Sequence, residues 1–191
     1  MKNLPKIGLL AVATAVSAPA LADDALSYTY IEAAYLDTEI DDGPDVDGDG
    51  YGIAGSFELT DALFLTASYA DQDFDFGIDS NRWTAGLGAH TPLADNLDLV
   101  GEIGYVDAEL ETGFGDVDDD GYYAGVGLRA RVAQHFELEG GLNYVDLDDS
   151  GDNTTVNLGG RYYLTDQFAI GAGIDFDDDV KTWQAGFRFE F

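Results

Sequence analysis

Alternating aspartates are the residues of this sequence whose spacing most resembles a metal-binding motif. The run Asp45-Val46-Asp47-Gly48-Asp49-Gly50 fits the pattern D-x-D-x-D-G, and Asp116-Val117-Asp118-Asp119-Asp120-Gly121 repeats it. In the first half of a calcium loop, alternate carboxylates converge on one cation and glycine allows a sharp turn. The closing position twelve, normally glutamate, is Ser56 in the first run and Gly127 in the second.

These aspartates have two interpretations. They are either solvated acidic loops that maintain solubility, or weak calcium sites with affinities of about millimolar, because affinity follows the number and rigidity of the ligands. The candidate ligands are Asp45, Asp47, Asp49, Asp116, Asp118 and Asp120. We expect no other cofactor.

Catalytic motifs are absent from the sequence. The only histidines are His90 and His135, and neither G-x-S-x-G nor H-E-x-x-H occurs. The chain has no cysteine, so disulfides and thiolate metal sites are excluded. We therefore predict that the protein is not an enzyme.

Charged residues form a second constellation, in which arginines and glutamates could pair. The sequence has five arginines, and all of them fall on the alternating polar positions of the predicted strands, the same parity that holds several glutamates and many glycines. The proposed network consists of Arg82, Arg129, Arg131, Arg161, Arg188, Glu32, Glu58, Glu102, Glu137, Glu139 and Glu190. Such a set could form a plug of ion pairs or line a narrow selective pore.

The elements that position these residues are strands, because polarity alternates with a period of two from Leu26 to Phe191. In the last segment, Trp183, Ala185, Phe187, Phe189 and Phe191 lie on one face. Ten runs follow this pattern: 26–36, 50–59, 63–71, 81–90, 97–107, 121–132, 136–146, 153–164, 168–176 and 181–191. An eight-strand alternative results if 63–71 and 81–90 are irregular. The fold class is all-β, with antiparallel strands.

The N-terminus and the connections indicate export to a membrane. Lys2 and Lys6 precede an apolar stretch that ends in Ala20-Leu21-Ala22, so residues 1–22 are predicted to be a signal peptide and 23–191 a single barrel domain. Short turns alternate with longer acidic loops, and these loops hold 26 of the 38 acidic residues. This alternation is typical of transmembrane β-barrels. The formal net charge of −30 makes nucleic acid an unfavourable partner.

The apolar positions of the alternation are expected to face lipid, because charged side chains that faced lipid would cost several kilocalories per mole. Aromatic residues gather near the strand ends, as in the two interfacial girdles of such barrels. They are Tyr51, Tyr69, Trp83, Tyr105, Tyr122, Tyr144, Phe176 and Trp183 on the loop side, and Phe57, Phe136, Tyr162, Phe168, Phe189 and Phe191 on the turn side. A soluble lipocalin-type barrel is the alternative, with its apolar face inward.

Both ends of the predicted barrel resemble a known group. The C-terminal Arg188-Phe189-Glu190-Phe191 is similar to the signature recognised by the outer-membrane assembly machinery, and 28–35 resembles the first strand of small OmpA-type barrels. Within that group the chain is most similar to short glycine-rich outer-membrane proteins associated with quorum sensing. The resemblance implies location in the outer membrane of a Gram-negative cell, a monomer, and contact with lipid and lipopolysaccharide.

The functional expectation is a barrel with a salt-bridged lumen and acidic extracellular loops, which has a structural role or takes part in interactions at the cell surface. Two alternatives stay open: a small porin-like diffusion channel and a calcium-dependent surface adhesion protein. In the latter, divalent cations could also bridge the acidic loops to lipopolysaccharide phosphates.

Overall fold

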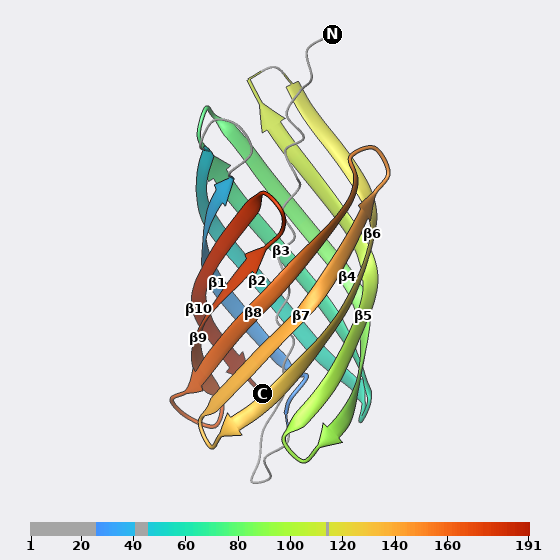
Figure 1. The fold of residues 1–191 in the computed structure, drawn as a ribbon, viewed down its shortest axis with the longest axis vertical. Coiled ribbons are helices and arrows are strands. Elements are labelled where there is room, and N and C mark those ends of the chain that lie inside the picture. The colour runs from blue at the N-terminus through green and yellow to red at the C-terminus, as the bar shows by residue number, and fades with distance from the viewer. Residues whose placement is uncertain (1–25, 41–45, 114) are drawn as a thin grey trace.

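Ten antiparallel strands form a closed barrel in the computed structural model, which describes residues 26–40, 46–113 and 115–191 (Figure 1). Each strand pairs with its neighbours in the chain, and the first pairs with the last. The strands are β1 (Tyr30–Ile40), β2 (Val46–Thr60), β3 (Leu63–Phe74), β4 (Ile78–Ala94), β5 (Leu97–Thr112), β6 (Gly115–Ala133), β7 (Phe136–Leu147), β8 (Gly151–Tyr163), β9 (Phe168–Phe176) and β10 (Val180–Glu190).

The predicted all-β class and the count of ten strands are confirmed. Within the described ranges, no helix is long and apolar enough to cross a membrane. The predicted signal peptide, residues 1–22, and Asp45 lie outside the described residues.

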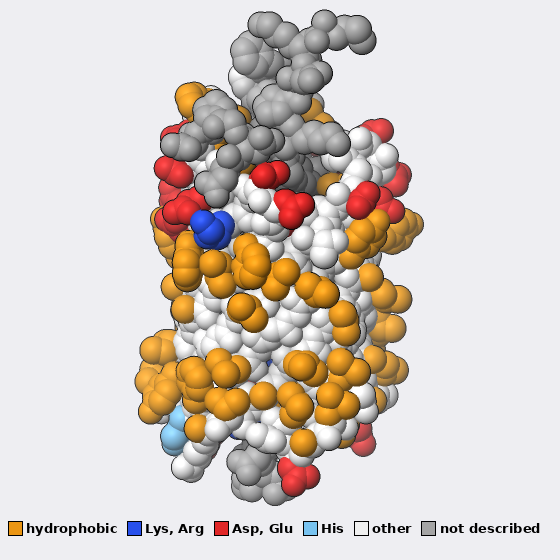
Figure 2. Space-filling model, viewed as in Figure 1, with side chains coloured by type: hydrophobic (Ala, Val, Ile, Leu, Met, Phe, Trp, Pro, Cys, Tyr) orange, Lys and Arg blue, Asp and Glu red, His pale blue; other side chains and the backbone are white. Residues whose placement is uncertain are grey.

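The two faces of the barrel wall differ in polarity as the alternation requires. Large apolar side chains are exposed on the outside, and Figure 2 shows them gathered in two bands, with acidic side chains beyond the upper band. The exposed aromatic residues include Tyr51, Trp83, Tyr122, Tyr144 and Trp183 on the loop side, and Phe57, Phe136, Tyr162, Phe189 and Phe191 on the turn side. The interior buries charged and hydroxyl side chains, together with apolar ones such as Phe64 and Val106.

The predicted start of the first strand is wrong by four residues, because the segment before β1 leaves the wall. Leu26, Ser27 and Tyr28 are buried, and Leu26 and Tyr28 cluster with Phe64 and Val100 from β3 and β5. Removing the apolar surface of Leu26 and Tyr28 from water favours this inward path.

The predicted loops are shorter than expected, because the strands continue into the acidic segments. β5 extends to Thr112 and β6 begins at Gly115, so most of 107–120 is paired backbone. The β3–β4 hairpin turns through Phe76 and Gly77, whose φ angles are 66° and 69°. Two successive positive φ angles are typical of the tight turns that join twisted antiparallel strands.

Candidate functional site in the barrel lumen

Three neighbouring strands supply the centre of a charged network in the lumen. Arg129 on β6 donates to Oε1 of Glu137 on β7, and Arg161 on β8 donates from Nη1 to the same oxygen at 2.9 Å. The Glu137 side chain has 0% exposure. Its carboxylate is therefore compensated by guanidinium groups from both adjacent strands, as a buried charge requires.

Arg161 also forms a two-pronged pair with Glu139. Nη1 donates to Oε2 at 2.7 Å, and Nη2 donates to Oε1 at 2.5 Å. Glycine makes room for this fork, because a Cβ at Gly159 would lie 3.0 Å from Oε1 of Glu139 and a Cβ at Gly171 would lie 3.0 Å from Cγ of Arg161. The bidentate geometry orders both side chains and fixes their orientation.

The strands that close the barrel carry a further ion pair. Arg188 on β10 and Glu32 on β1 are direct register partners, and Nε of Arg188 donates to Oε2 of Glu32 at 2.9 Å. The guanidinium carbon of Arg188 also lies 3.9 Å from the centre of the Tyr30 ring. This pair ties the first strand to the last through side chains as well as backbone.

Tyr163 connects the carboxylates of the network. Its hydroxyl lies 3.2 Å from Oε2 of Glu137 and 2.7 Å from Oε1 of Glu190. Arg131 reaches Oε2 of Glu137 at 3.4 Å and lies 4.2 Å above the Tyr163 ring. Side chains from β6, β7, β8 and β10 therefore meet around Glu137.

The segment before β1 is anchored beside this network. The Tyr28 ring stacks against both Phe64 and His90, with ring centroids 4.7 Å and 3.7 Å away. Its hydroxyl donates to Oδ2 of Asp98 at 2.9 Å, and Nδ1 of His90 lies 3.0 Å from the same oxygen. Arg129 adds a hydrogen bond from Nη1 to the Ser27 carbonyl at 3.3 Å. We call these contacts the Tyr28 anchor.

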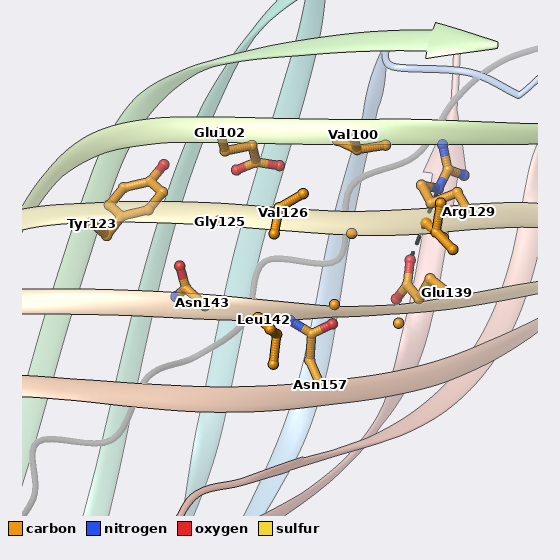
Figure 3. A pocket seen from close by; sticks show the side chains of 14 residues that line it. Val100, Glu102, Tyr123, Gly125, Val126, Arg129, Glu139, Leu142, Asn143 and Asn157 are labelled. Atoms are coloured by element: carbon orange, nitrogen blue, oxygen red, sulfur yellow. Dashed lines mark ion pairs between the residues drawn. The ribbon is translucent and has the colours of Figure 1, made fainter. Parts of the chain in front are cut away.

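The remaining predicted network members lie on lumen positions without joining the network. Arg82, Glu58 and Glu102 form no ion pair with any other residue in the described ranges. Glu102 lines a pocket with Tyr123, Asn143 and Asn157, and Figure 3 shows Arg129 and Glu139 at one end of it.

The Tyr28 anchor was not predicted from the sequence, although the alternation held one indication of it. Tyr28 and Tyr30 share the parity of Glu32, so the alternation already placed them on the lumen face. It could not indicate that the chain before Tyr30 leaves the wall. The role of Tyr163 as a connector was also missed, because parity shows the face of a side chain and not its partners.

The predicted calcium ligands within the described ranges are exposed positions on strands. Asp47 and Asp49 lie on β2, and Asp116, Asp118 and Asp120 lie on β6. In the described part of the chain, no group of three or more acidic or histidine side chains is placed to hold one metal ion. Calcium binding therefore stays a prediction.

A row of acidic residues crosses six strands on the outer surface, on the loop side of the aromatic girdle. Its members are successive cross-strand partners, all exposed, and we call them the acidic row: Asp37, Asp49, Asp73, Asp79, Glu111 and Asp116. Directly opposed like charges destabilise a sheet. A shared hydrogen bond with Asp79, together with the charge of that neighbour, raises the pKa of Asp73.

The chain matches one protein family, and several solved structures are similar to it. The profile of a family described as "Outer membrane protein beta-barrel domain" matches residues 8–176. The structure of Ail, the attachment invasion locus protein of Yersinia pestis, is 16% identical with a TM-score of 0.44, over 85% of this chain and 97% of Ail. OprG from Pseudomonas aeruginosa is 10% identical with a TM-score of 0.46, over 86% of this chain and 96% of OprG.

The NanC porin has a TM-score of 0.51 at 9% identity, over 85% of this chain and 100% of NanC. At that identity the similarity shows a shared fold. No curated protein matches the sequence.

Proposed function

Because the chain belongs to the family of outer membrane proteins with a β-barrel domain and lies in the outer membrane, we propose that it is a closed barrel that acts at the cell surface. In this proposal the body of the barrel is structural, and the acidic strand extensions on the loop side carry the interactions. The association of similar proteins with quorum sensing stays a resemblance and supplies no mechanism.

The charged network carries the proposal of a closed lumen. Glu137 is compensated by Arg129 and Arg161, which come from the strands on either side of it, and Tyr163 extends the contacts to Glu190. Removing one partner would leave a buried charge uncompensated, at a cost of about 3–5 kcal/mol. The Tyr28 anchor adds three stacked rings to the same region of the lumen. Opening a pore here would require breaking several of these contacts together.

The test is ion conductance of the refolded mature protein in planar bilayers, with and without millimolar calcium. A wild-type protein that inserts and stays silent supports the closed barrel. Arg129→Ala removes a guanidinium that contacts both Glu137 and the Tyr28 ring, so it is expected to give a leak. A steady wild-type conductance that Arg129→Ala changes would make the protein a small diffusion channel and contradict the proposal.

The acidic row favours a second, compatible function, in which divalent cations mediate surface contacts. Row members Asp49 and Asp116 are also predicted calcium ligands. The row lies just outside the aromatic girdle, on the side where lipopolysaccharide phosphates are expected, and carboxylates repel phosphates unless a cation lies between them. Divalent ions bridging the row to these phosphates would relieve both repulsions.

Terbium luminescence on the refolded protein tests this function, because nearby tyrosines can sensitise a bound lanthanide. We expect terbium to bind, calcium to compete, and the double variant Asp73→Asn/Asp79→Asn to weaken binding several-fold. Asp166→Asn, an exposed aspartate on the turn side, is the matched control and should leave binding unchanged. Equal binding by the double variant and the wild type would exclude the row as the cation site.

A further inference from the structure

Arg82 differs from every other arginine in its partners. Arg129, Arg131, Arg161 and Arg188 each pair with a glutamate. Arg82 has no hydrogen bond or ion pair within the described ranges, although only 6% of the residue is exposed. A guanidinium is charged at every physiological pH and offers five donors. The interior therefore holds one buried cation that no carboxylate compensates.

The strand register explains why no acid reaches it. The direct partners of Arg82 on β3 and β5 are Ala70 and Ala108, both buried. The diagonal lumen neighbours are Ser68, Gln72, Val106 and Leu110, and the positions before and after Arg82 on the same face are Ser80 and Thr84. None of these eight side chains is acidic, although the chain has 38 acidic residues.

The position of Arg82 in the lumen separates it from the charged network. It precedes Trp83 of the loop-side girdle, whereas the Tyr28 anchor and Glu137 lie toward the short turns. Asp119, on β6 two strands away, directs its carboxylate to backbone N–H groups of Asp149 and Ser150. Glu102 shares β5 with Ala108 but lies six residues nearer the turns.

We propose that Arg82 anchors a binding site for a small carboxylate or phosphate anion in the loop-side half of the lumen. Carboxylates and phosphates carry two oxygens on one carbon or phosphorus atom, and these match the planar fork of a guanidinium. This geometry favours both kinds of anion over a monatomic ion. The direct strand partners are alanines, which offer no charge or hydrogen bond to the fork, and the surrounding hydroxyl and amide side chains bring no competing negative charge. The anion enters from the loop side, because the charged network obstructs the turn side. The inference does not depend on the cell-surface role of the acidic row.

Binding of radiolabelled inorganic phosphate, measured by equilibrium dialysis on the refolded full chain in detergent, tests the site. We expect saturable binding of one phosphate per barrel, and displacement by acetate if the site also takes carboxylates. Arg82→Gln should weaken binding by about tenfold or more, the value of a charge-assisted hydrogen bond, and Arg82→Lys should retain part of it.

Lys181→Gln is the control for charge, because Lys181 lies at the loop rim and pairs with Glu39 outside the lumen. It should change binding by less than about twofold if the local contact of Arg82, and not overall charge, holds the anion. Heat-dependent gel mobility shows that each variant is folded. Absence of saturable binding of both phosphate and acetate to the folded wild type, or equal binding by folded Arg82→Gln, would overturn the proposal.

Discussion

The ring of Tyr28 stacks on the imidazole of His90 at a centroid distance of 3.7 Å and an interplanar angle of 27°, and both residues contact Oδ2 of Asp98. This relationship holds the chain before β1 inside the barrel. It joins residues from the N-terminal segment, β4 and β5 into one buried unit.

Truncating Tyr28 should therefore destabilise the barrel from inside. Tyr28→Ala is expected to lower the free energy of unfolding by about 3–5 kcal/mol, as for other buried aromatic truncations. Tyr28→Phe removes only the hydroxyl, leaves Asp98 short of one donor, and should cost about 1–2 kcal/mol. Guanidinium unfolding followed by the fluorescence of Trp83 and Trp183 measures both. Equal stability of Tyr28→Ala and wild type would mean that the anchor contributes nothing.

Glu137→Gln should be among the most destabilising single changes in the lumen. It removes the charge that compensates Arg129 and Arg161, and the expected loss is about 3–5 kcal/mol. Glu58→Gln is the matched control, because Glu58 has the same lumen parity and no ion pair in the described ranges, and it should change stability by less than about 0.5 kcal/mol. Similar losses from both variants would contradict a specific role for the network.

Asp119 should control the β7–β8 hairpin on the loop side. Burial of its carboxylate acts to raise the pKa, but hydrogen bonds from Ser150 and from the backbone of Asp149 outweigh it and hold the pKa below its ordinary value. A lowered folded pKa means that the stabilisation is present above the ordinary value of about 3.9 and is lost as pH falls through the folded pKa.

Asp119→Ala should therefore lower hydrogen-exchange protection in residues 147–151 at neutral pH by about tenfold or more, since charged hydrogen bonds contribute about 1.5–3 kcal/mol. Below the folded pKa, wild type and variant should converge. Protection that stays different at low pH would show that Asp119 acts through packing instead.

Asp73→Asn should stabilise its hairpin, whereas Asp119→Ala should destabilise its own. The raised pKa of Asp73 means that the folded state holds the proton more tightly, so the repulsion from Asp79 is fully present above the folded pKa and disappears as pH falls below the unfolded value. The variant should increase protection of the β3–β4 hairpin at pH 7 by a few-fold and have no effect near pH 3. A decrease at pH 7 would show that the pair is stabilised by something other than a shared proton.

The fold was predictable where one period governs the chain. The alternation assigned Arg129, Arg161 and Glu137 to the polar face. This assignment was safe because a one-residue slip in register would turn all three side chains toward lipid. The strand extensions were not recognised, because Asp and Gly are poor strand formers and resemble loops. Their backbone pairing comes from the hairpins they continue, as in the Glu109–Asp118 register pair.

The sequence predicted which residues face the lumen better than it predicted which of them contact one another. Parity places Arg82 and Arg161 on the same face, yet Arg82 lies between two alanines, whereas Arg161 pairs with two glutamates of one neighbouring strand. That difference depends on the register of three strands at once, which a period of two does not specify. The departure of Tyr28 from the wall likewise follows from packing against Phe64 and His90, residues distant in sequence.

The pairing of β1 with β10 also has a kinetic consequence. It joins Tyr30 to Glu190, so the contact that completes the barrel spans almost the whole described chain. Contacts of such high sequence separation are the slowest to form, because the entropy of closing a long loop is lost before they contribute. Until that step, two strands present unpaired edges that can join other chains. The chain can therefore misassemble with other chains until β10 pairs with β1.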